Sequence, residues 1–139
     1  MSAPKQMFIK GIFTPKLSLD VFEVLPLEEG KPINYSLSHR FTEIDDKTGQ
    51  TDLRFQITKE SNVGFTAEVI VSAVFEVENY KENSEGLYLM KNTAITILYP
   101  YLRNAVSQLC SLAGVTKVTL PVIDTIQTFG DQTAQSGNS

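Results

Sequence analysis

The chain of 139 residues contains one histidine and one cysteine, so few side chains are available for nucleophilic or metal chemistry. His39 lies at an apolar-facing position of an alternating segment, and the spacing places no nucleophile or carboxylate beside it. Cys110 lies on the apolar side of a helical pattern, where we expect a small buried hydrophobe. These two residues cannot form a structural zinc site. The sequence therefore predicts no enzyme activity, no cofactor and no metal site.

Charge and hydropathy exclude several classes of partner. The formal net charge is -4 and no run of Lys or Arg occurs, which argues against nucleic acid and acidic membrane surfaces. No apolar run reaches the roughly 18 residues of a membrane span, and the first residues lack a signal-peptide pattern. We expect a cytoplasmic protein without membrane insertion. One domain is expected over residues 1–130, followed by a low-complexity, disordered tail at 131–139.

Alternation of apolar and polar side chains predicts a four-stranded sheet. Segments 33–41, 53–59 and 65–78 each place apolar residues at every second position, which gives one dry face and one wet face. A further strand is expected within 7–24, bent or bulged where Gly11 and Pro15 interrupt it. The short connections favour antiparallel hairpins, whereas residues 25–31 are long enough for a crossover connection.

Two C-terminal helices are expected to cover one face of this sheet, which makes the fold class α+β. A long helix is predicted at 94–113 and a short one at 123–129. Residues 94–130 contain only three charged side chains, Arg103, Lys117 and Asp124. Because this segment is more apolar than one sheet face requires, we expect the long helix to contact a second copy of the chain. The expected oligomer contacts are Ile95, Leu98, Leu102, Ala105, Leu109 and Cys110.

Three motifs resemble one known family. Residues 97–103, ILYPYLR, are similar to the Ile-Leu-Phe-Pro-Tyr-Ala-Arg motif of the SecB protein-export chaperones. Residues 120–124, LPVID, stand where that family has a Leu-Pro-Val-Asn type segment before its second helix, and residues 12–19, IFTPKLSL, resemble its first strand. The resemblance extends over nearly all of the expected domain.

The resemblance implies a homo-oligomer, a dimer of dimers, that acts as an ATP-independent holdase. Its clients would be unfolded polypeptides, either preproteins for export or non-export clients such as those of toxin-antitoxin systems. An apolar groove without a fixed polar constellation suits clients of varied sequence. The expected client-binding residues, each of which could instead be core, are Val24, Leu25, Leu27, Ile33, Tyr35, Leu37, Ile123, Ile126 and Phe129.

The resemblance also concerns the translocase motor SecA, which docks on an acidic sheet surface in this family. Asp20 and Glu68 stand where such acidic positions would lie, but Lys16 is close to another and the tail is nearly neutral. We therefore expect weak or absent SecA binding. An alternative from another class is a small-ligand-binding α+β protein with its site around His39, Tyr35 and Arg103. A long open groove would favour the holdase, and a closed pocket with convergent polar groups would favour the alternative.

Overall fold

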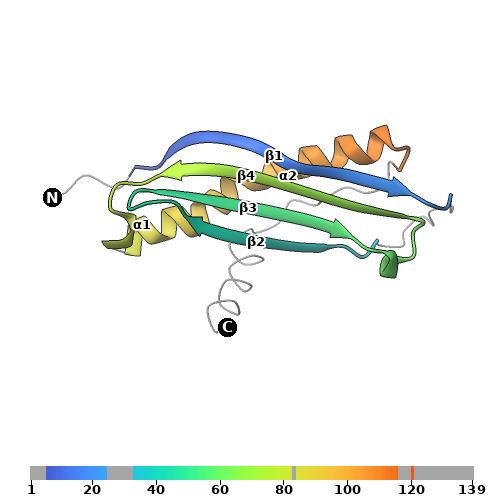
Figure 1. Ribbon diagram of the computed structural model, residues 1–139, viewed down its shortest axis with the longest axis horizontal. Coiled ribbons are helices and arrows are strands. Elements are labelled where there is room, and N and C mark those ends of the chain that lie inside the picture. Colours follow the sequence, from blue (N-terminus) through green and yellow to red (C-terminus); the bar gives the residue numbers. More distant parts are fainter. Residues whose placement is uncertain (1–5, 25–32, 83, 116–119, 121–139) are drawn as a thin grey trace.

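A sheet and a long helix form the two layers of the molecule (Figure 1). The structure is a computed structural model, and it describes residues 6–24, 33–82, 84–115 and 120. The strands are β1 (Phe8–Val21), β2 (Ser36–Glu43), β3 (Thr48–Ile57) and β4 (Phe65–Glu76). The helical elements are η1 (Lys59–Ser61), η2 (Tyr80–Glu82), α1 (Ser84–Tyr88), the π-turn η3 (Leu89–Thr93) and α2 (Ala94–Leu112). Within the described ranges, no helix is long and apolar enough to cross a membrane.

The strands form one antiparallel sheet in the order β1-β4-β3-β2. β1 and β2 are consecutive in the sequence but lie at opposite edges, so the chain between them crosses the sheet. The predicted four-stranded antiparallel sheet, its crossover connection and the α+β class are confirmed. The short helix predicted at 123–129 and the tail at 131–139 lie outside the described residues.

The β2–β3 hairpin differs most from its predicted boundaries. β3 already begins at Thr48 because Gly49 pairs with Glu43 of β2, and Thr48 pairs with Glu76 of β4. The turn is thus reduced to a few residues around Asp45, whose carboxylate accepts hydrogen bonds from the backbone N–H groups of Lys47 (2.9 Å) and Thr48 (2.8 Å). The N–H of Lys47 is the main reason that the pKa of Asp45 is lowered.

β1 is irregular at the two predicted places. Its register against β4 shifts between Ile9 and Gly11 and again between Phe13 and Lys16, a stretch that includes Pro15. Bulges of this kind are typical of edge strands, where a proline leaves no ladder hydrogen bond unmade. The predicted interruption of the first strand is confirmed.

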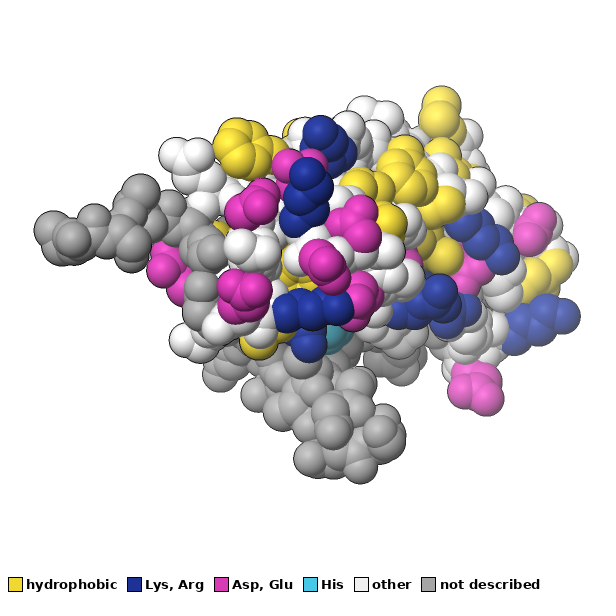
Figure 2. Space-filling view, turned by 60° about the vertical axis from the view of Figure 1, so that its left-hand side comes forward, with side chains coloured by type: hydrophobic (Ala, Val, Ile, Leu, Met, Phe, Trp, Pro, Cys, Tyr) yellow, Lys and Arg dark blue, Asp and Glu magenta, His cyan; other side chains and the backbone are white. Residues whose placement is uncertain are grey.

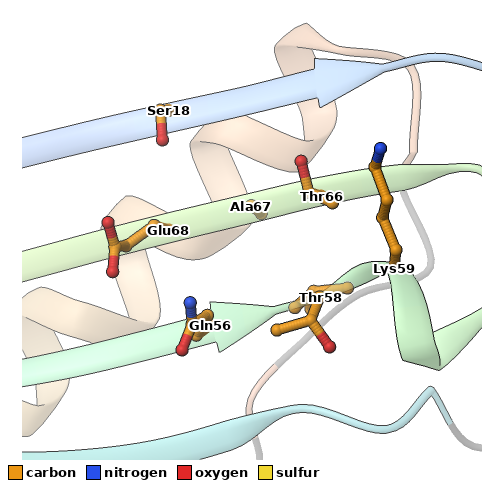
Figure 3. A pocket seen from close by; sticks show the side chains of 8 residues that line it. Ser18, Gln56, Thr58, Lys59, Thr66, Ala67 and Glu68 are labelled. Carbon is orange, nitrogen blue, oxygen red and sulfur yellow. The ribbon is translucent and has the colours of Figure 1, made fainter.

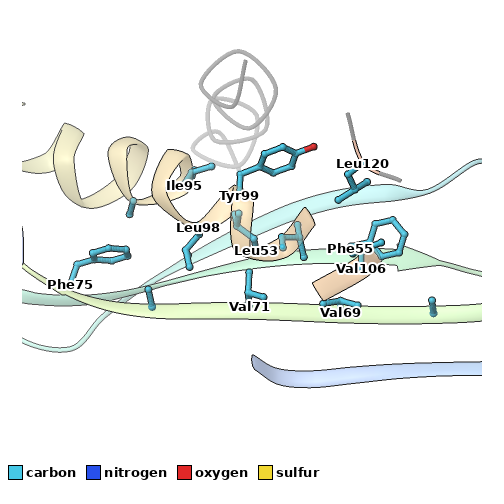
Figure 4. Packing of buried hydrophobic residues seen from close by; sticks show 14 of the residues in the cluster. Leu53, Phe55, Val69, Val71, Phe75, Ile95, Leu98, Tyr99, Val106 and Leu120 are labelled. Carbon is cyan, nitrogen blue, oxygen red and sulfur yellow. The ribbon is translucent and has the colours of Figure 1, made fainter. Parts of the chain in front are cut away.

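The core lies between the sheet and α2, which crosses β3 and β4 (Figures 1 and 4). The helical run starts at Ser84 and continues through the π-turn to Leu112, with Pro100 exposed on its outer side. Alternate residues of β3 and β4, such as Phe55 and Val69, are fully buried beneath it. Every second residue of β3 and β4 thus contributes to the core, as the alternation predicts.

Candidate functional site

Aromatic side chains lie close together from three places in the chain: just before β2, in β3 and in α2. The Tyr35 ring lies 5.4 Å from that of Phe55 (centroid to centroid), and Tyr35 remains 37% exposed while Phe55 is buried. Tyr99 of α2 is close enough to Tyr35 for the two hydroxyls to interact electrostatically. The pKa of Tyr99 is raised, mainly because its side chain is buried. Ile33 and Leu37 are half-buried beside this group. We call Ile33, Tyr35, Leu37, Tyr99 and Leu120 the aromatic surface.

Leu120 reaches this surface from a distant part of the chain. Its side chain is only 4% exposed and belongs to the buried core cluster, where Figure 4 shows it above Phe55. The Nε–H of Arg103 donates a hydrogen bond to the Leu120 carbonyl oxygen at 3.1 Å. Arg103, which the sequence offered as part of a small-ligand site, therefore binds the backbone of its own chain.

Both flanks of the crossover meet the β3–β4 connection. The N–H groups of Phe22 and Glu23 donate to the Gly64 carbonyl at 3.0 and 3.1 Å. The Ser61 hydroxyl donates to the Asn34 carbonyl at 2.6 Å. Residues shortly after β1 and shortly before β2 are thus fixed at the same end of the sheet.

The predicted client-binding residues are only partly brought together. Ile33, Tyr35 and Leu37 lie in the aromatic surface, although only Leu37 belongs to β2, because the strand begins at Ser36 rather than at residue 33. Val24, 90% exposed, follows β1. Leu25, Leu27, Ile123, Ile126 and Phe129 lie outside the described residues. Tyr99 and Leu120 were not among the predicted residues; the motifs that contain them were the only sequence signal.

The predicted oligomer contacts on α2 lie mostly inside the subunit. Ile95, Leu98, Leu102 and Cys110 are buried against the sheet of their own chain, and only Ala105 and Leu109 keep half-exposed side chains. The buried stripe recurs at every fourth residue, through Leu98, Leu102, Val106 and Cys110, rather than in the alternating steps of a coiled-coil seam. Burial raises the pKa of the Cys110 thiol to about 11.

A set of exposed apolar side chains lies on and just after β1, on both faces of the sheet. We call it the β1 edge, and its six side chains are each between 44% and 56% exposed: Phe8, Ile9, Phe13, Leu17, Val21 and Phe22. Leu17 pairs with Val69 and Val21 with Phe65, so both project to the core side of the sheet. They stay exposed because β1 is an edge strand and α2 lies mainly over β3 and β4.

The outer face of the sheet carries charges of both signs (Figure 2). Glu68 of β4 pairs with Lys16 at 2.6 Å and with Arg54. The hydrogen bond from Lys16 and then that from Arg54 lower the pKa of Glu68 against the opposing effect of burial. Asp20, the other predicted docking residue, is exposed near the end of β1.

Glu68 borders a depression of about 260 Å³ on this outer face. Ser18, Glu68 and Gln56 lie side by side on three neighbouring strands, with Thr66 and Lys59 beyond them (Figure 3). Among the described residues, no group of three or more His, Cys, Asp or Glu side chains could hold a metal ion. His39 is half-buried on β2, opposite Leu53 of β3.

Known proteins resemble this chain over most of its length. A family model described as SecB, preprotein translocase subunit, matches residues 1–136. The chain is 27% identical over 140 residues to the protein-export protein SecB of Saccharophagus degradans, covering 96% of this chain and 83% of that one. It is 30% identical over 122 residues to the protein-export protein SecB of Neisseria meningitidis, covering 84% and 82%.

A solved structure shares the fold. It is a SecB-like chaperone of Mycobacterium tuberculosis in complex with a peptide from an antitoxin, with a TM-score of 0.62 and 17% identity. The match covers 84% of this chain and 90% of the other.

Proposed function

The chain belongs to the SecB family, and from this premise we propose that it is an ATP-independent holdase that binds unfolded polypeptides without catalysing a reaction, in the cytoplasm. The family match over residues 1–136 is the observation that carries this proposal. The accessible part of the aromatic surface, Ile33, Tyr35 and Leu37, supports it, because partly exposed apolar side chains bind apolar segments of varied sequence. One domain over residues 1–130 with a disordered tail at 131–139 remains our prediction.

We propose that the clients include proteins other than preproteins. This proposal is supported by the M. tuberculosis chaperone with the same fold, which was solved with an antitoxin peptide. The ion pairs of Glu68 support a limited role in export. Since Lys16 and Arg54 already neutralise this carboxylate, it offers little attraction to a basic surface of SecA. SecA docking through Asp20 and Glu68 is therefore expected to be weak or absent.

The proposed assembly is a homo-oligomer, a dimer of dimers, in which the β1 edge contributes one contact. An edge strand presents unpaired backbone groups that a second strand can bind, and β1 flanks this edge with six half-exposed apolar side chains. The outer side of α2 supports a further contact: its exposed polar residues, such as Asn104, Ser107 and Gln108, are uncharged. Ala105 and Leu109 would belong to that contact.

The test combines solution mass with holdase activity. We expect light scattering to give a mass above that of one chain, and an excess of the protein to suppress aggregation of a chemically denatured, unrelated protein without nucleotide. A matched excess of serum albumin controls for crowding. Full aggregation of the denatured protein in the presence of a folded, assembled chain would contradict the holdase proposal.

A further inference from the structure

Arg103 is the only charged residue of α2, whose other eighteen positions are apolar or uncharged polar residues. It is half-buried, and a charged side chain in such a place needs hydrogen-bond partners to offset the loss of hydration. Its Nε–H donates to the carbonyl oxygen of Leu120, 17 residues further along the chain. This bond holds Leu120, a residue that belongs to neither α2 nor the sheet.

Leu120 lies far back along α2 from the end of the helix. Gly114, with φ of +83°, ends the helix and reverses the chain, and the Val115 N–H donates to the Cys110 carbonyl at 2.7 Å. Leu120 then lies beside Arg103, nine residues before the helix ends at Leu112, a distance of about 14 Å along the helix axis. Leu120 has returned along α2 towards the middle of the helix.

The position of Leu120 in turn shapes the aromatic surface. Its buried side chain belongs to the same cluster as Phe55 and Tyr99, and Figure 4 shows it above Phe55, the ring against which the exposed Tyr35 lies. Movement of the Leu120 backbone would uncover Phe55 and remove one side of the surface. The carbonyl bond to Arg103 is a specific restraint against that movement.

We propose that Arg103 is a positioning residue for polypeptide binding, because it holds Leu120 in place at the aromatic surface. This proposal rests on the proposed holdase function. Arg103 contacts the chain's own backbone, so it acts through Leu120. A planar guanidinium suits this role better than a lysine ammonium, since its Nε–H is directed sideways from a stiff group.

The experiment compares Arg103→Gln and Arg103→Lys with Arg40→Gln, the same change at an exposed arginine of β2. Binding of fluorescently labelled, reduced and carboxymethylated α-lactalbumin, which stays unfolded, is measured by anisotropy. Loss of a hydrogen bond from a charged donor predicts roughly 10-fold weaker binding for Arg103→Gln. We expect an intermediate loss for Arg103→Lys and wild-type affinity for Arg40→Gln.

Hydrogen exchange separates positioning from a general structural role. Arg103→Gln is expected to accelerate exchange in peptides around residues 115–120 and to leave β3 and β4 at wild-type rates. Unchanged client affinity in Arg103→Gln would refute the role of Arg103, as would faster exchange throughout the sheet. If Arg103→Gln does not fold, Arg103→Lys decides by the same two measurements. Wild-type protein that binds no client would refute the proposed function itself.

Discussion

Substitution of Leu17 by glutamate tests whether the β1 edge joins two copies of the chain. Leu17 is 51% exposed on the core side of the sheet, opposite Val69. Complete burial of a leucine contributes about 1.5–3 kcal/mol, so covering the exposed half contributes roughly 1 kcal/mol per copy. A two-fold contact loses this twice, about 2 kcal/mol in all, which raises the dissociation constant roughly 30-fold. Two buried carboxylates would weaken the contact further.

The assay is sedimentation velocity over a wide dilution series, with circular dichroism to confirm the fold. Ile44→Glu is the matched control, because Ile44 is also 51% exposed but lies in the turn after β2, away from β1. Leu17→Glu should dissociate at concentrations where both wild-type protein and Ile44→Glu remain assembled. Folded Leu17→Glu with the wild-type dissociation constant would refute the role of the β1 edge.

Four further predictions concern the core, the outer face and the partners. Leu102→Ala removes a fully buried side chain and should lower the free energy of unfolding by about 2–5 kcal/mol in urea titrations. Gly86→Ala places a Cβ 2.7 Å from the Tyr80 Cα, so its melting temperature should fall below that of wild type, whereas an equal value would contradict the close approach. The pKa of Glu68 is lowered in the folded protein, so its ion pairs stabilise the fold fully above pH 4.5. This stabilisation is lost as the pH falls through the folded-state pKa. The difference in melting temperature between wild type and Glu68→Gln should therefore shrink with acidification. Pull-down with purified SecA should recover little of this protein, and submicromolar affinity would overturn the expected weakness of docking.

Local patterns in the sequence predict the elements of this fold well. The alternation of apolar residues places β2, β3 and β4, and Gly11 and Pro15 mark the irregularities of β1. The predicted start of β2 at residue 33 is wrong for a physical reason. Ile33 and Tyr35 continue its alternation but precede the first residue that pairs with β3, so the side-chain pattern extends beyond the ladder.

The candidate site depends more on contacts between distant residues. Exposure of Leu17 follows from the strand order, which puts β1 at an edge, and no local pattern encodes that order. The scarcity of charged residues on α2 suggested a contact between copies of the chain, but Leu98 and Leu102 are fully buried in the core of their own subunit. The bond from Arg103 to Leu120 joins residues 17 positions apart, and although the sequence singled out Arg103 as a rare charge and a small-ligand candidate, no local pattern paired it with Leu120.

Burial of Cys110 has a practical consequence for studies of this protein. The thiol is 1% exposed, and a pKa of about 11 leaves almost no thiolate at neutral pH. Maleimide dyes should therefore react with it only when α2 separates from the sheet, so the labelling rate reports opening of the core. A second cysteine engineered at an exposed site could carry a fluorophore selectively, without removal of the native one.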